Sequence, residues 1–507
     1  MTATLPAPEP EISADGAGFP GPGSVTWQLL GQWRMTLVMP RLLVLQAAHP
    51  VVGAGLAKHS TYRTHPWRRV DHTLISLQRF VYAPPEQRLQ EVQRVLRAHR
   101  RIKGTDDRGR DYSAEQPEVR AWVLGTVFEA MSSMERLAGR PLSPAHEMRL
   151  YDEWCATLGA FGLDRDLLPA DLAGFWDYFE RMQREVLEDN TEVRFLMRDM
   201  YRGAATPSQL EWCPPVWSLM RSSAAMLMPG AVAAQLPQTY RERLHLHVGQ
   251  ADRALSRMVH HAARTAMEPL PLRSRYMPVA AAAMTGQAAA SGADEARPGG
   301  IRLPGAGLLA RPLGLVKAVA SAAVRGQDRD SRADRLGRFF SQVLDQTGDG
   351  RIDAPDLQAM ARALCWQLQL TPEQEDKVYA GFTAWWDHMR ATMDTDGDGS
   401  VSKDEWVTAM LRNCDADPGY VRDGVHHAVR AMFEAVDTDG SGAIDRHEYR
   451  TVFAGGRVDP GDLDRGFDEL DRDKDGAISL PELLDGLTAF FMAREPTAAG
   501  TQLLGRA

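Results

Sequence analysis

Apolar residues in the first 290 positions of the chain recur at intervals of three and four. Leu89, Val92 and Leu96 follow this spacing, and so do Trp122 and its apolar successors. Such a spacing places side chains on one face of an α-helix. The every-second-residue alternation of a strand is hard to find, and prolines and glycines divide the pattern into helices of ordinary length. The sequence therefore predicts an all-α fold.

A chain of 507 residues is too long for one hydrophobic core, so we expect separate modules. The order predicted is a disordered arm over residues 1–24, a helical domain over 25–287 and a linker with a candidate amphipathic helix over 288–330. An acidic helical module over 331–495 and a tail over 496–507 complete the chain.

Four 12-residue stretches of the acidic module repeat one pattern. They are Asp345–Asp356, Asp394–Glu405, Asp437–Glu448 and Asp471–Glu482, each with a glycine at the sixth position and a carboxylate at the twelfth. The glycine permits a sharp turn. The eighth positions are all β-branched, which suits a short strand pair between neighbouring loops. The repeat resembles the EF-hand of calmodulin-like and calerythrin-like calcium-binding proteins and implies a four-EF-hand domain.

The spacing of oxygens fits a hard cation. Ca²⁺ takes about six to eight oxygen ligands at ~2.3–2.6 Å, from positions 1, 3, 5, 7, 9 and 12 of such a loop. The seventh residue contributes only its backbone carbonyl. The predicted ligand positions are Asp345, Thr347, Asp349, Arg351, Asp353 and Asp356; Asp394, Asp396, Asp398, Ser400 and Glu405; Asp437, Asp439, Ser441, Ala443 and Glu448; and Asp471, Asp473, Asp475, Ala477 and Glu482.

The four loops are not equivalent. The second has a full acidic set, whereas the first has neutral Thr347 at its third position and Asp356 at its twelfth. Aspartate is one methylene shorter than glutamate, so closing the cage with both oxygens is harder and the smaller Mg²⁺ gains ground. We expect the first loop to be the weakest calcium site.

Charge is unevenly divided along the chain. Residues 334–495 hold 33 acidic and 17 basic side chains, a net of −16, and the remainder holds 34 acidic and 41 basic, a net of +7. Ion ligands account for the acidic third. The basic surplus elsewhere is diffuse and lacks interleaved aromatic residues, which argues against nucleic-acid binding.

Cysteine use and hydropathy favour a cytoplasmic protein. The four cysteines are widely spread without a CxxC pair, so neither a disulfide framework nor a zinc site is expected. The acidic, proline-rich beginning of the chain does not have the order of a secretory signal. No stretch approaches ~18 uninterrupted apolar residues, so we predict no membrane span.

The segment 305–325 is apolar with interspersed Arg311, Lys317 and Arg325. A basic amphipathic helix is the kind of target that EF-hand grooves bind, so an intramolecular contact with the acidic module is one interpretation. The alternative is a packed helix or a frayed linker.

Histidines stand out in the helical domain, which has no nucleophile triad and no phosphate-binding glycine loop. His49 is surrounded by small residues that permit close approach of a helix or a flat ligand, and His99 lies on the apolar face of its helix. A lone histidine in such a place is usually a core residue. A non-haem metal site of His49, His59 and His99 is a further possibility.

Four short motifs point to a family. AAHPVVGAGLAKHS, then Arg68–Arg69 with Thr73, then VQRVLRAHRRIKG and DYSAEQPEVRAWV resemble the latex-clearing-protein and MpaB-type oxygenases, over about residues 27–287. The resemblance implies a helical haem-oxygenase-like domain that holds haem b, with an axial histidine and an Arg-x-x-x-Thr pair on the distal side.

Carried over by motif, His99 is the axial candidate, with His49 as the runner-up, and Arg69 and Thr73 form the distal pair. His72 stands where latex-clearing members have a lysine, which leaves the sixth iron ligand open. Characterised members cleave alkenes with dioxygen, which implies a small apolar organic substrate.

Two functions follow from these features. In the first, calcium ions bind the acidic module and regulate an oxygenase-like domain. In the second, the protein is a calcium sensor or buffer whose helical domain is a non-catalytic platform for partners.

Overall fold

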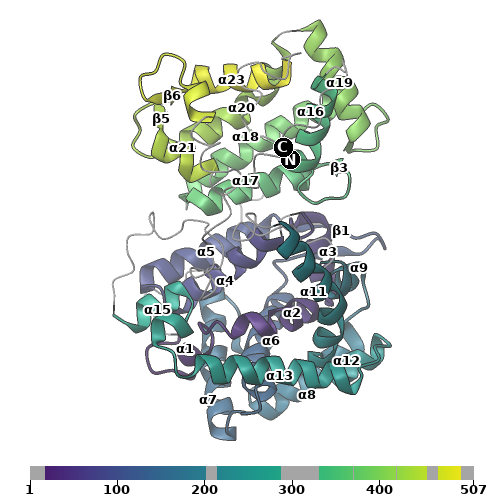
Figure 1. The fold of residues 1–507 in the computed structure, drawn as a ribbon, viewed down its shortest axis with the longest axis vertical. Helices are drawn as coiled ribbons and strands as arrows, with labels where there is room; N and C mark the ends of the chain where they lie inside the picture. Colours follow the sequence, from purple (N-terminus) through teal and green to yellow (C-terminus); the bar gives the residue numbers. More distant parts are fainter. Residues whose placement is uncertain are drawn as a thin grey trace, which may run out of the picture. The chain divides into compact units, whose positions relative to one another are not determined.

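The computed structural model of the chain describes residues 18–64, 66–200, 214–286, 331–368, 370–417, 419–453 and 466–492. The predicted arm up to residue 17, the linker with its candidate helix at 305–325, and the tail lie outside these residues. The described part is helical apart from three two-stranded ribbons, which confirms the all-α prediction (Figure 1).

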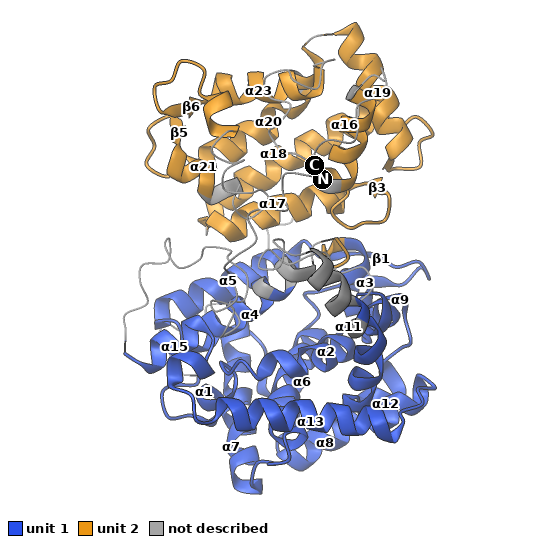
Figure 2. Cartoon of the chain, in the orientation of Figure 1, with its two compact units in different colours: residues 1–58, 66–295 blue, residues 59–65, 296–507 orange. Residues whose placement is uncertain are grey.

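The chain divides into two compact units (Figure 2). The first comprises residues 1–58 and 66–295, and the second residues 59–65 and 296–507. The short segment 59–65 therefore belongs to the second unit although the chain on both sides of it belongs to the first.

The first unit is built around helix α6 (Pro117–Leu137), which is buried on nearly every side. Helices α2 (Met35–Ala47), α7 (Pro144–Cys155) and α13 (Gln250–Met267) pack against it. The other helices of this unit are α1 (Val25–Leu29), α3 (Pro50–His59), α4 (Pro66–Tyr82), α5 (Pro85–Arg100), α8 (Leu172–Arg181), α9 (Thr191–Arg194), α11 (Pro214–Gln235), α12 (Gln238–Arg243), α14 (Leu272–Arg275) and α15 (Pro278–Met284), with the ribbon β1 (Lys103–Thr105) and β2 (Asp111–Ser113).

Helices α4 and α5 pack against one another and are joined by only two residues. The start of α4 and the end of α5 therefore lie at the same end of an antiparallel pair. Among the described residues, no single helix combines the length and hydrophobicity needed to cross a membrane. Helices α2 and α3 have this length and hydrophobicity only when they are taken together, and the chain bends by 103° between them.

The second unit carries the four acidic loops, each between two helices. Its helices are α16 (Ser331–Phe339), α17 (Ala354–Leu368), α18 (Pro372–Met393), α19 (Lys403–Ala416), α20 (Tyr420–Val436), α21 (Arg446–Phe453) and α23 (Leu480–Met492). Helix α18 packs against α17 and α20 in the middle of the unit, and Trp406 contacts the rings of Phe339 and Phe491 in its core.

Short ribbons join the acidic loops in pairs. Strand β3 (Arg351–Ile352) pairs with β4 (Val401–Ser402), and β5 (Ala443–Asp445) pairs with β6 (Ala477–Ser479). The β-branched eighth residues face each other, Ile352 opposite Val401 in the first ribbon. The expected strand pairing is confirmed, and it makes each pair of loops one structural element.

A buried ion pair ties α2 to α6 in the first unit. Arg41 Nε donates to Glu129 Oε2 at 3.0 Å, and the two residues are 4% and 0% exposed. Burial by itself would raise the pKa of Glu129, yet the charge and hydrogen bonds of Arg41 bring that pKa below its ordinary value. The carboxylate is therefore ionised and needs its partner.

We predict that Glu129→Ala lowers the free energy of unfolding by about 3–5 kcal/mol, because it strands a buried guanidinium. The double variant Arg41→Met/Glu129→Leu should recover most of that loss, since no charge remains buried. Denaturant unfolding of the full chain measures both. A single variant as stable as wild type would contradict the prediction.

Candidate metal centres

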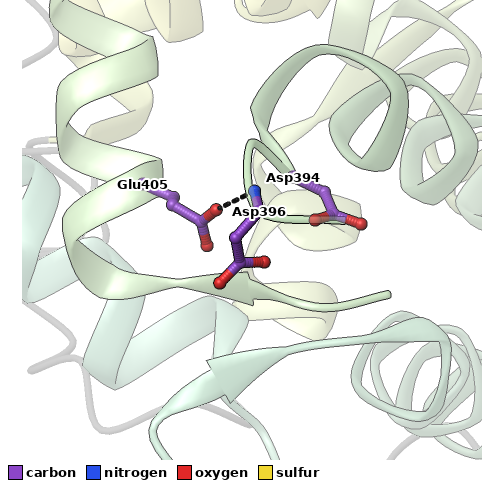
Figure 3. Close-up of side chains that lie close together, drawn as sticks. All are labelled: Asp394, Asp396 and Glu405. Carbon is purple, nitrogen blue, oxygen red and sulfur yellow. Dashed lines mark hydrogen bonds between the residues drawn. The ribbon is translucent and has the colours of Figure 1, made fainter. Parts of the chain in front are cut away.

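The second acidic loop brings three carboxylates together between α18 and α19. One oxygen each of Asp394, Asp396 and Glu405 lies within 4.8 Å of the other two, and Figure 3 shows the three side chains close together. Carboxylates at such distances repel unless a cation lies between them. The geometry is therefore that of a site that can hold a metal ion.

Backbone and hydroxyl donors hold this arrangement in place. Both oxygens of Glu405 accept hydrogen bonds, from the N–H of Thr395 at 2.9 Å and from the N–H of Ser402 at 2.9 Å. Ser402 is also the N-cap of α19, and Glu405 completes its capping box. The backbone hydrogen bond from Ser402 and the donors of Thr395 bring the pKa of Glu405 to about 2. The carboxylate is thus ionised and oriented by the start of the helix.

Loops three and four repeat the cluster. Oxygens of Asp437, Asp439 and Glu448 lie within 4.8 Å of one another, as do those of Asp471, Asp473 and Asp475. Asp471 is only 6% exposed, and its Oδ1 atom is buried without a hydrogen-bond partner in the described part of the chain. A buried carboxylate oxygen without a donor is what a bound cation would satisfy.

In the fourth loop, the twelfth-position carboxylate is oriented by backbone donors, as in the second loop, but lies outside the cluster. Glu482 accepts hydrogen bonds from the N–H groups of Arg472 at 2.9 Å and Ser479 at 2.8 Å, and it is not part of the three-aspartate cluster. It occupies the same capping position as Glu405 does in the second loop.

The first loop differs from the others in its burial. Asp345, Thr347 and Asp356 are 7%, 3% and 0% exposed. The acidic side chains of this loop do not bring three carboxylate oxygens together as those of the other loops do. Burial, followed by the charge of Asp353, raises the pKa of Asp356 to about 8. A proton therefore competes with a cation for the twelfth-position carboxyl of this loop. The ranking of the four loops by calcium affinity stays a prediction.

Arg351 links the first loop to the second. Its Nη1 forms an ion pair with Asp398 and donates to Ser400 Oγ at 2.8 Å. The loop pattern assigns Arg351 only a backbone carbonyl, at the seventh position. Its side-chain role depends on the β3–β4 register, which places Arg351 opposite Ser402 and which the loop pattern does not specify.

The predicted haem residues all lie in the first unit. Arg69 and Thr73 are in α4, and His99 is near the end of α5, so these three residues lie toward the same end of the α4–α5 pair. His49 lies between α2 and α3, 8% exposed, and its Nδ1 is buried without a partner among the described residues. Burial brings the pKa of His49 to about 4, so its imidazole is neutral at pH 7.

We predict that Arg351→Gln raises the calcium affinity of the second loop by up to about fivefold, the range of an exposed ion pair. The reason is that Asp398 is released to face the ion. Isothermal titration of the full chain measures the change, with exposed Arg412→Gln as the matched control. In a Glu405→Gln background the gain should vanish. An unchanged or lower affinity would contradict the interpretation.

Comparison with known protein families assigns the two parts of the chain to different families. Residues 27–267 match the family described as "ER-bound oxygenase mpaB/B'/Rubber oxygenase, catalytic domain". The EF-hand family matches four times, at residues 342–361, 391–411, 429–454 and 463–487.

Similar proteins are found for the acidic module. The probable calcium-binding protein CML16 of Oryza sativa subsp. japonica is 36% identical over 170 residues, which cover 32% of this chain and 81% of CML16. Calcium-binding protein CML19 of Arabidopsis thaliana is 25% identical over 149 residues, or 29% of this chain and 78% of CML19. A Streptomyces coelicolor calcium-binding protein of known structure matches with 23% identity and a TM-score of 0.30, over 32% of this chain and 99% of that one.

Proposed function

The chain belongs to the EF-hand calcium-binding family and carries an MpaB/rubber-oxygenase catalytic domain, and from this premise we propose that it is a haem-dependent oxygenase regulated by calcium. The observation that carries the proposal is the presence in one chain of four EF-hand loops and of a domain that matches an oxygenase family.

The calcium sites of this proposal are the second, third and fourth loops. In each of these loops, the aspartates at the first and third positions would bind the calcium ion together. These pairs are Asp394 with Asp396, Asp437 with Asp439, and Asp471 with Asp473. Glu405, Glu448 and Glu482 would close the three cages, and the carbonyls of Ser400, Ala443 and Ala477 would complete them. The first loop would fill last, or with Mg²⁺.

One histidine of the first unit supports the haem proposal by its chemistry. Burial brings the pKa of His49 to about 4, its Nδ1 has no partner among the described residues, and a neutral imidazole is the form that binds iron. His99, carried over from the family motif, would hold the haem iron, with His49 as the alternative. Haem b, when bound, would supply the iron centre for reaction of dioxygen with a small apolar organic substrate.

The other two proposed residues, Arg69 and Thr73, would position a polar atom by charge and by hydrogen bonding. Arg69 would provide a fixed positive charge and Thr73 a hydroxyl donor, four residues apart and so on one face of α4. Both would bind and orient a polar oxygen atom next to the substrate.

A segment of chain offers a route for calcium regulation. Residues 59–65 belong to the calcium-binding unit, and they continue directly into α4, which carries Arg69 and Thr73. Thr64 Oγ1 donates to the carbonyl of Gln346 in the first acidic loop, and Arg362 of α17 donates to the carbonyl of His59. Ion binding to the paired loops would therefore act on the segment that precedes the proposed catalytic helix.

Localisation in the cytoplasm is part of the proposal. Cys155 and Cys414 are buried and form no disulfide within the described part of the chain, as in a protein of a reducing compartment.

We predict that full-length protein supplied with haem shows a Soret band, and that His99→Ala abolishes it because the axial ligand is lost. His49→Ala, the matched control, should retain the band. Visible absorption measures both. The reverse outcome would assign the ligand to His49. A colourless wild-type protein would overturn the enzyme proposal in favour of a calcium sensor with a non-catalytic platform.

The regulatory route has its own test in the glycines at the fourth position of the loops. A Cβ at Gly348 would lie 2.8 Å from Thr64 Cγ2, whereas one at Gly397 would meet nothing within 4 Å. Both glycines have left-handed backbones, with φ of +76° and +73°. Alanine therefore costs the same backbone strain of about 1–2 kcal/mol at either position, and only Gly348→Ala displaces Thr64.

We expect calcium to slow amide hydrogen exchange in residues 59–73 of wild-type protein. Gly348→Ala should lose this protection at saturating calcium, and Gly397→Ala should keep it. Protection that is absent from wild type, or equal in the two variants, would contradict coupling through this segment. The measurement needs no haem, so it can fail independently of the spectrum.

A further inference from the structure

The first unit contains a cavity that is not lined by any of the proposed haem ligands. It has a volume of about 540 Å³ and lies among the turn after α1, the α6–α7 connection, the end of α13 and α14. Its lining does not include His49, Thr73 or His99. A cavity of this size suits a small organic ligand.

Positive charge exceeds negative charge on the walls of this cavity. Four arginines line it, Arg34, Arg140, Arg264 and Arg275, together with His146, against the carboxylates of Glu135 and Glu268. Arg34 pairs with Glu135, and Arg140 pairs with Glu268 at 3.2 Å. No carboxylate of the described residues forms an ion pair with Arg264 or Arg275. Two guanidinium charges of the lining are therefore left without a counter-ion.

Three of these arginines also have buried nitrogens without an acceptor in the described part of the chain: Arg34 Nη1, Arg264 Nε and Arg275 Nε. Arg34 is only 8% exposed and is fixed by Gln32, which accepts from its Nε at 2.9 Å, and by Glu135. Buried donors normally have acceptors, so these three guanidinium groups of the lining have fewer acceptors than donors among the described residues.

The rest of the wall combines apolar side chains with neutral polar ones. Leu29, Pro141, Leu142, Met267 and Tyr276 line the cavity together with Gln28, Gln32 and Ser143, and the Tyr276 hydroxyl donates to the carbonyl of Gln28 at 2.9 Å. Burial, and then the charge of Arg34, bring the pKa of nearby His260 to about 4.

We propose that this cavity binds a small organic anion, with its carboxylate or phosphate head on Arg34, Arg264 and Arg275 and its apolar body against Leu142 and Met267. Guanidinium groups bind such oxyanions through paired, charge-assisted hydrogen bonds. The site is separate from the haem and calcium sites, and the proposal does not depend on either.

The test is isothermal titration of the full chain with decanoate, decyl phosphate, inorganic phosphate and decan-1-ol. Saturable binding of decanoate or decyl phosphate, but not of the alcohol, is expected, and the preferred head distinguishes carboxylate from phosphate ligands. Arg264→Gln and Arg275→Gln should each weaken that binding by about tenfold or more, the value of a charge-assisted hydrogen bond. Exposed Arg257→Gln, also on α13 but outside the lining, is the matched control.

A further variant guards against misfolding. Glu268→Gln removes negative charge from the lining and should tighten anion binding severalfold, which an unfolded protein cannot imitate. The proposal is overturned if neither anion binds, if the alcohol binds equally well, or if the lining variants bind as tightly as Arg257→Gln.

Discussion

The crowding of carboxylates in the acidic loops is the constraint on which the second unit depends. Backbone N–H groups and helix-capping hydroxyls hold three anionic side chains within 4.8 Å of one another in each of three loops. Repulsion at these distances opposes the compact form, and a divalent cation replaces it with attraction. The loops occur in ribbon-linked pairs, so filling one loop changes the surroundings of the next.

Much of this organisation could be predicted from local sequence. The 12-residue repeat specifies which oxygens converge, because a short loop with a glycine at its sixth position has few ways to fold. The β-branched eighth residues predicted the ribbons, and the three-and-four spacing of apolar residues predicted helices around α6. Loops, ribbons and helices of this kind could be predicted because residues close together in sequence determine their geometry.

Features that depend on residues distant in sequence could not be predicted. The Arg351 side chain reaches Asp398, 47 positions away, only because β3 and β4 pair. The burial of Asp356 depends on how the unit packs, and its composition gives no sign of it. The membership of residues 59–65 in the calcium-binding unit, and the arginine-lined cavity between α1, α6, α13 and α14, likewise depend on the tertiary fold.

The most direct test of calcium as a structural partner of the second unit is scanning calorimetry of the full chain in excess Ca²⁺ and in chelator. We predict that calcium raises the melting transition of the acidic unit, since each ion bound at about 100 times its dissociation constant adds ~2.7 kcal/mol to stability. Identical melting in the two conditions, with no heat on titration of calcium, would contradict ion-dependent compaction.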